Sequence, residues 1–178
     1  DKDLITISRD HAGIKPLYYA EIQQGLVFGS EVKGMLDKVP NSRTIDNLAA
    51  SFQSRTGLNP LRNTLFSGIK KLLPGETIVW DIENKKISAT KRIYIKPNSN
   101  IKFNQTEFRE QLAKAVRRCS IGRRKIGVFL SGGLDSSVVA YELGKINEEV
   151  HTFTNYFSPD VQGDEDFNSD AKAARVLA

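Results

Sequence analysis

The chain has 178 residues, of which 39% are hydrophobic, and a formal net charge of +5. This length and composition predict one large or two small globular domains and exclude a disordered chain. No apolar run is long enough to span a membrane, and no aromatic residues interleave the basic cluster at residues 117–125. The sequence therefore predicts neither a membrane partner nor a nucleic-acid partner.

The first 40 residues are typical of an antiparallel sheet followed by a short helix. Residues 4–8 alternate as a strand, residues 9–16 form a polar turn, and residues 17–20 and 26–29 are two further strands. A helix is expected over residues 31–36, with Ser30 as its N-cap.

The next 60 residues predict a helix, a hairpin and a linker. Residues 44–58 have apolar positions at helical spacing and are stopped by Gly57 and Pro60. Residues 77–81 and 87–90 are expected to pair as strands, and the polar segment 96–100 has the composition of a linker. We therefore expect two domains, residues 1–96 and residues 104–178.

The second part predicts a βαβ unit. An amphipathic helix is expected over residues 104–119, with Asn104 and Glu107 spaced as a capping box. Residues 126–130 and 150–156 are predicted to be buried parallel strands on either side of a helix. Ser169 is expected to cap a last helix, and the acidic residues between 160 and 166 are expected to form a solvated loop.

The single cysteine and the ends of the chain lead to two further predictions. Cys119 excludes an internal disulfide and lies on the apolar face of the helix at 104–119, so we interpret it as a core residue. The chain begins at Asp1, its only methionine is Met35, and two parallel strands cannot bury both faces of a sheet. We therefore expect that the native protein extends at both ends.

The stretch S-G-G-L-D-S-S at residues 131–137 joins the strand to the helix. Two glycines permit positive φ and a close approach of a ligand, and the helix start adds unpaired N–H groups. Such a nest suits a phosphate group. No lysine precedes Ser136, as a Walker loop requires, and Phe129 occupies a position that is glycine in a nucleophile elbow.

Residues 130–137, L-S-G-G-L-D-S-S, resemble the pyrophosphate-binding loop of the ATP pyrophosphatase (PP-loop) family, in the form seen in asparagine synthetases. Three earlier segments resemble the glutaminase domain of the same enzymes. They are R-D-H-A-G-I-K-P-L-Y-Y at residues 9–19, F-G-S-E-V-K at residues 28–33 and T-L-F-S-G-I-K-K-L-L-P-G at residues 64–75.

The resemblance implies an α/β chain in two parts. Residues 1–96 would be the end of an N-terminal-nucleophile αββα sandwich, and residues 104–178 the start of a parallel-sheet PP-loop ATP pyrophosphatase domain. The family's nucleophilic cysteine has no counterpart here, so no catalytic residue is expected in this chain. We expect Arg9 to pair with Asp10, and Lys15 and Glu31 to form charge pairs, in a purely structural role.

The resemblance also implies an activity, namely ATP-dependent amidation of aspartate through an aspartyl-adenylate. Ammonia would come from glutamine, and the products would be asparagine, AMP and pyrophosphate. ATP, aspartate and glutamine are the implied small-molecule partners, and Mg²⁺ is the implied metal. A cytoplasmic enzyme is expected, and a homodimer is left open.

The expected ATP and pyrophosphate site follows the motif residue by residue. Backbone N–H groups would hold the phosphates with help from the serine hydroxyls, and backbone at Leu130 and Asn155 would hold the adenine. Asp135 would either contact Mg²⁺ or cap the helix. The site residues are Leu130, Ser131, Gly132, Gly133, Leu134, Asp135, Ser136, Ser137 and Asn155.

Two departures from the family pattern keep alternatives open. Tyr156 stands where the family usually has glycine, and Arg124-Lys125-Ile126-Gly127 replaces a common Val-Pro-x-Gly. One alternative is a related amidotransferase or cyclase that acts on a sugar, peptide or β-lactam precursor. Another is a non-catalytic binding relative, although the full set of loop glycines and hydroxyls argues against it.

Overall fold

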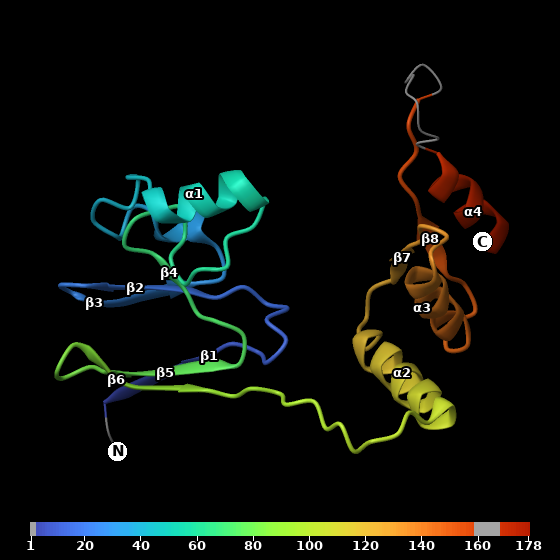
Figure 1. The fold of residues 1–178 in the computed structure, drawn as a ribbon, viewed down its shortest axis with the longest axis horizontal. Coiled ribbons are helices and arrows are strands. Elements are labelled where there is room, and N and C mark those ends of the chain that lie inside the picture. The colour runs from blue at the N-terminus through green and yellow to red at the C-terminus, as the bar shows by residue number, and fades with distance from the viewer. Residues whose placement is uncertain (1–2, 159–167) are drawn as a thin grey trace. The chain divides into compact units, whose positions relative to one another are not determined.

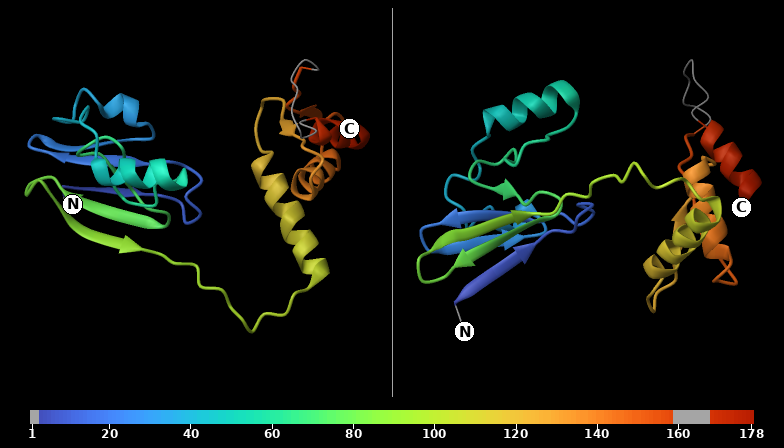
Figure 2. Two further views of the ribbon diagram at one scale, coloured as in Figure 1. Left: turned by 45° about the horizontal axis from the view of Figure 1, so that its top comes forward. Right: turned by 60° about the horizontal axis from the view of Figure 1, so that its bottom comes forward.

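The computed structural model describes residues 3–158 and 168–178, and the chain divides into two compact units, residues 1–98 and residues 99–178. Figures 1 and 2 show the elements of each unit. The predicted acidic loop lies outside the described residues. No helix in the described part of the chain is long and apolar enough to cross a membrane.

The first unit contains two antiparallel sheets of three strands each. One sheet has the order β1-β5-β6, formed by Leu4–Ser8, Glu76–Asp81 and Lys86–Arg92. The other has the order β3-β2-β4, formed by Gly25–Gly29, Tyr18–Ile22 and Lys70–Lys71.

The main hydrophobic core joins these two sheets. Ile7 and Ile78, which are register partners in the first sheet, pack with Tyr19 of the second sheet and with Leu72. Residues alternate between buried and half-buried along β5, as expected for a strand with one face in the core. Figure 1 shows the two sheets of this unit one above the other.

A second cluster covers the other face of the β3-β2-β4 sheet. Ala20 and Ile69 pack there against Met35 of the 3₁₀ helix η1 (Val32–Met35) and against Val39. The predicted Ser30 cap was wrong, because the cap position is Glu31 and no side chain caps this short helix. A 3₁₀ turn this short has few orphan N–H groups for a cap to satisfy.

Helix α1 (Asn47–Thr56) is capped at both ends. The Asp46 carboxylate accepts a hydrogen bond of 2.9 Å from the Ala49 N–H. Gly57 ends the helix with a φ of 70°, in the left-handed region that favours glycine. The predicted stop at Gly57 is therefore confirmed, and the helix is shorter than the predicted 44–58 segment.

The polar turn at residues 9–16 is held by backbone contacts. Arg9 donates to the carbonyl oxygens of Lys15, Gly13 and Leu72 at 2.9, 2.7 and 2.8 Å, and the Asp10 carboxylate accepts from the N–H groups of Ile14 and Lys15. These N–H bonds lower the pKa of Asp10. The predicted Arg9–Asp10 pair was wrong because the turn itself leaves carbonyls and N–H groups that need partners.

The other predicted charge pairs of this region are not formed. Within residues 3–158 and 168–178, neither Lys15 nor Glu31 takes part in an ion pair. A buried ion pair that the sequence did not predict joins Glu76 of β5 to Arg62, with two N···O distances of 2.6 Å.

Glu76 is 1% exposed and also accepts from the Leu73 N–H at 2.8 Å. Burial of Glu76 opposes ionisation of its carboxyl group, but the hydrogen bonds from Arg62 and Leu73 outweigh that effect and lower its pKa. The same pair raises the pKa of Arg62 above its usual range. Glu76 is therefore a charged link between strand β5 and the loop that carries Arg62.

The second unit holds a short parallel pair of strands between helices. Strands β7 (Gly127–Phe129) and β8 (His151–Phe153) pair in parallel, with Val128 opposite Thr152, and helix α3 (Leu134–Gly144) connects them. Helix α2 (Gln105–Cys119) precedes β7, and helix α4 (Ser169–Leu177) ends the unit.

Several boundaries in this unit differ from expectation. Both strands are shorter than predicted, and only Val128 within them is buried, because the described residues supply only two short strands to this sheet. Asn104 caps α2 as predicted, accepting from the Thr106 and Glu107 N–H groups. Ser169 is the first residue of α4 and not its cap, which is Asn168 without a side-chain cap bond.

The apolar face of helix α2, predicted to be part of a core, is not buried. Cys119 is exposed, Phe108 is 55% exposed, and no residue of α2 is buried. Four residues of α2 instead border an open cavity that β7 and α3 also line, namely Leu112, Ala115, Val116 and Cys119. The prediction that Cys119 is a core residue was therefore wrong, because nothing among the described elements closes that cavity over it.

Candidate functional site

The glycine loop, residues 130–137, leaves the end of β7 and enters α3. Leu130 is 3% exposed, and its N–H donates to the Phe153 carbonyl of β8 at 2.8 Å. The Thr154 hydroxyl donates in turn to the Leu130 carbonyl. The start of the loop is therefore fixed to both strands of the parallel pair.

Gly132 gives the loop its turn and its contact with α4. Its φ is 77°, which side-chain-bearing residues rarely adopt. A Cβ atom placed on Gly132 would overlap the Cβ of Ala173 and lie 3.0 Å from the Ala174 nitrogen. Gly132 is thus required both by its backbone conformation and by the close packing of α4.

The loop presents backbone N–H groups that have no protein partner. Gly133 is the N-cap of α3, and no side chain caps this helix. The Ser137 N–H bonds to the Gly133 carbonyl at 3.1 Å, but among the described residues nothing accepts from four other N–H groups. These four belong to Gly132, Leu134, Asp135 and Ser136. With the positive end of the α3 dipole, they form a site suited to an anion.

The three serine hydroxyls of the loop bond within the loop. The Ser137 hydroxyl donates to the Gly133 carbonyl at 2.6 Å, and the Ser136 hydroxyl donates to the same carbonyl at 3.1 Å. The Ser131 and Ser136 oxygens lie 3.1 Å apart. The hydroxyls are therefore engaged with the loop itself, and the free donors are backbone N–H groups.

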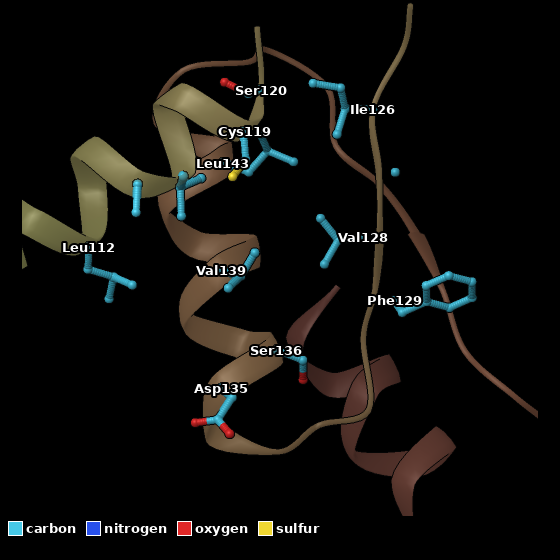
Figure 3. Close-up of a pocket in the computed structure, with 13 residues that line it drawn as sticks. Leu112, Cys119, Ser120, Ile126, Val128, Phe129, Asp135, Ser136, Val139 and Leu143 are labelled. Carbon is cyan, nitrogen blue, oxygen red and sulfur yellow. The ribbon is translucent and has the colours of Figure 1, made fainter. Parts of the chain in front are cut away.

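Asp135 lies in the first turn of α3, and its carboxylate makes no capping bond. In Figure 3 it stands at the start of the helix, at one end of a cavity of about 570 Å³ between α2, β7 and α3. The walls of this cavity are mainly apolar, and Val128 of β7 points into it toward Val139 of α3. The helix-cap role, one of the two expected for Asp135, is not formed, because no side chain caps α3.

A single carboxylate without a capping bond, beside N–H groups that have no acceptor among the described residues, fits Mg²⁺. This ion commonly takes one or two carboxylates from the protein and its other ligands from phosphates and water. Within the part of the chain that the structure describes, no group of three or more His, Cys, Asp or Glu residues could hold a metal by itself. The residues present therefore fit a metal ion that arrives with a nucleotide.

A smaller cavity of about 220 Å³ lies on the other side of the loop start. It brings together Leu130, Ser131 and Asn155, which the sequence placed in one site. Sequence reasoning missed four further lining residues. They are Phe129, Phe153, Thr154 and Asp170.

No local sequence signal sets Phe129 apart, because residues 126–130 read as one buried apolar strand. In the structure Phe129 is 81% exposed, whereas its neighbours Val128 and Leu130 are buried. The alternation of a strand places its side chain on the opposite face from Val128, and Phe129 borders both the small and the larger cavity. Its ring centroid lies 6.3 Å from that of Phe153, so two aromatic rings border the small cavity.

Two family models match the chain. One, described as a glutamine amidotransferase domain, matches residues 1–95, and the other, described as asparagine synthase, matches residues 107–178. The glycine loop lies within the second match.

Curated proteins match over most of the chain. It is 29% identical over 197 residues to "Asparagine synthetase [glutamine-hydrolyzing] 2" of Bacillus subtilis (strain 168), covering 100% of this chain and 25% of the relative. A "Putative asparagine synthetase [glutamine-hydrolyzing] 2" of Methanocaldococcus jannaschii is 29% identical over 86% of the chain and 31% of its own length. "Amidase chyE" of Penicillium rubens is 28% identical over 97% of the chain and 27% of its own length. The chain spans about a quarter to a third of these relatives.

Proposed function

Because the chain belongs to the asparagine synthetase family, with a glutamine amidotransferase part followed by an asparagine synthase part, we propose that it acts in the ATP-dependent amidation of aspartate. Ammonia released from glutamine would be the nitrogen donor. The products would be asparagine, AMP and pyrophosphate.

The proposal divides the chain between two tasks. Residues 1–96 form the end of the glutaminase αββα sandwich, and residues 104–178 form the start of the PP-loop domain with its parallel sheet. The stacked antiparallel sheets of the first unit and the parallel β7–β8 pair of the second support this division. A structural role for Arg9, Asp10 and Glu76 is supported by their bonds, which go to the backbone or to Arg62.

The observation that carries the proposal is the set of free N–H groups in the glycine loop. Four such donors lie at the start of α3, and one of them belongs to Gly132, whose φ is 77°. Such preorganised donors stabilise charge where it develops in a transition state. In adenylation that charge develops on the departing pyrophosphate.

The reaction can be written in two steps. A carboxylate oxygen of aspartate attacks the α-phosphorus of ATP, and the bond to the oxygen that bridges the α- and β-phosphorus atoms breaks, releasing pyrophosphate. Ammonia then attacks the acyl carbon, the bond between that carbon and the AMP oxygen breaks, and a proton leaves the nitrogen. The N–H groups of Gly132, Leu134, Asp135 and Ser136 hold the β- and γ-phosphates throughout the first step.

The remaining site residues position the nucleotide. Backbone at Leu130 and Asn155 would hold the adenine, and both residues line the small cavity beside the loop. Asp135 would hold Mg²⁺, which when bound neutralises charge on the phosphates. The cytoplasmic location and the homodimer stay predictions.

A second candidate is amidation or cyclisation of a different carboxylate by the same phosphate chemistry. Tyr156, where the family usually has glycine, is 61% exposed immediately after Asn155 of the small cavity. A relative named as an amidase, rather than as an asparagine synthetase, also matches nearly the whole chain. These two observations concern the substrate and leave the phosphate chemistry unchanged.

The full-length protein, supplied with ATP, Mg²⁺ and ammonia, tests the proposal. We expect pyrophosphate release that requires aspartate and yields AMP. Release only with another carboxylic acid, from a panel that includes glutamate and β-amino acids, would support the second candidate. No release with any acceptor would support a non-catalytic binding relative.

A further inference from the structure

We propose that Ser136 is a positioning residue whose hydroxyl acts with that of Ser131 as one unit, which holds the loop's N–H groups toward a pyrophosphate. The inference rests on the proposed function, because it concerns the same loop. It differs from the expectation that the serine hydroxyls contact phosphate directly.

The Ser136 oxygen is the centre of a set of bonds inside the glycine loop. It accepts from the Ser131 N–H at 3.2 Å and lies 3.1 Å from the Ser131 oxygen. It also donates to the Gly133 carbonyl at 3.1 Å. The Gly133 N–H reaches the Ser131 oxygen over 3.4 Å. Both residues that flank Gly132 are thus tied to one another through two hydroxyls.

The Gly133 carbonyl accepts from the Ser137 N–H at 3.1 Å and from the Ser137 hydroxyl at 2.6 Å, and the Ser136 hydroxyl is a third donor at 3.1 Å. Between the Ser131 and Ser136 hydroxyls, either oxygen can be the donor. The two hydroxyls are therefore bonded to one another and to the loop backbone.

This arrangement sorts the N–H groups of the loop into two sets. Those of Ser131 and Gly133 are engaged by the two hydroxyls, and those of Gly132, Leu134, Asp135 and Ser136 are not. The free N–H groups are left as the donors for the diphosphate end of the nucleotide.

A double-mutant cycle separates one linked unit from two independent contacts. The full-length protein and its Ser131→Ala, Ser136→Ala and double variants are titrated with magnesium pyrophosphate in a calorimeter. Each single change is expected to weaken the Kd by about tenfold, the effect of one lost hydrogen bond. The double variant is expected to lose about the same tenfold.

Two controls make the result specific. Ser120→Ala removes a hydroxyl that donates to the Arg117 carbonyl at 2.9 Å elsewhere in the same unit, and it should leave the Kd unchanged. Ser136→Thr keeps the hydroxyl and should keep the Kd within about threefold of the original. Thermal unfolding of every variant shows whether a weaker Kd comes from a destabilised fold. If Ser136→Ala is destabilised, the Kd of Ser136→Thr is compared with that of the unaltered protein instead.

The outcomes distinguish this inference from the proposed function. An additive loss of about a hundredfold in the double variant, or an unchanged Kd in Ser136→Ala, would overturn the inference alone. Absence of magnesium pyrophosphate binding to the unaltered protein would overturn the proposed function and this inference together.

Discussion

Gly132 of the glycine loop lies against Ala173 of α4 so closely that a Cβ atom on the glycine would overlap the Cβ of the alanine. The loop is therefore shaped by a helix that begins 37 residues later in the chain, as well as by its own glycines. Of the two loop glycines, Gly132 is therefore the one that tolerates a side chain least.

Replacing Gly132 with alanine should remove pyrophosphate release almost completely. The new methyl group would meet Ala173 and the Ala174 nitrogen, and alanine tolerates a φ of 77° poorly. We expect a loss of about a hundredfold or more in ammonia-dependent pyrophosphate release by the full-length protein, because the N–H donors would be displaced. Glutamine hydrolysis should be nearly unchanged.

Gly122→Ala is the matched control for that variant. A Cβ on Gly122 meets nothing within 4 Å, and its backbone does not require glycine. Its activity should equal that of the unaltered protein. An equal loss in both variants would mean that the loop conformation is not what the reaction requires.

Asp135→Asn tests the proposed metal contact. The carboxylate makes no capping bond, so its loss should change the free energy of unfolding by less than about 1 kcal/mol, through the helix dipole alone. The Mg²⁺ concentration for half-maximal pyrophosphate release should rise by about tenfold, since one charged ligand is lost. Asp46→Ala removes the cap of α1 and should lower the free energy of unfolding by about 1 kcal/mol. It should leave the Mg²⁺ requirement unchanged.

Glu76→Gln tests the buried ion pair of the first unit. The side chains of Glu76 and Arg62 are 2% and 34% exposed, so the guanidinium would lose its charge partner while only partly hydrated. We expect the free energy of unfolding in urea to fall by about 2–3 kcal/mol. Glu21→Gln, whose carboxylate lies 3.6 Å from Lys70 on the surface, should cost less than about 1 kcal/mol.

The same carboxyl group predicts how stability depends on pH. The pKa of Glu76 in the folded protein lies below its ordinary value of 4.5, so its stabilisation is fully present above about pH 4.5. It is lost as the pH falls from there through the folded pKa, because the unfolded chain then binds the proton more readily. Unfolding free energies measured from pH 7 to pH 3 should fall less steeply in Glu76→Gln. Equal slopes in the two proteins would contradict this assignment.

Several parts of the fold that depend on neighbouring residues could be predicted from the sequence, although the local caps expected at Ser30 and Ser169 were wrong. The glycine loop, its strand and its helix follow from an apolar run, two glycines and a helix-forming segment, all within 20 residues. The caps at Asn104 and Gly57 are likewise local signals. The structure shows each of these features at the expected place.

The parts that depend on distant residues could not be predicted. Ala173 of α4 and Glu76 of β5 owe their roles to contacts with Gly132 and Arg62, which no local pattern indicates. The bonds among the loop hydroxyls depend on side-chain rotamers and on the number of available protons. Arg9 was predicted to pair with the neighbouring acidic residue because of their opposite charges. In the structure it donates to three backbone carbonyl oxygens instead.

Transfer of AMP to a carboxylate at the glycine loop is tested most directly by an isotope experiment. The full-length protein would convert aspartate labelled with ¹⁸O in its side-chain carboxylate, in the presence of ATP, Mg²⁺ and ammonia. An aspartyl-adenylate predicts that one labelled oxygen leaves with AMP and the other stays in the asparagine amide. Label in inorganic phosphate, with ADP as the nucleotide product, would contradict the account.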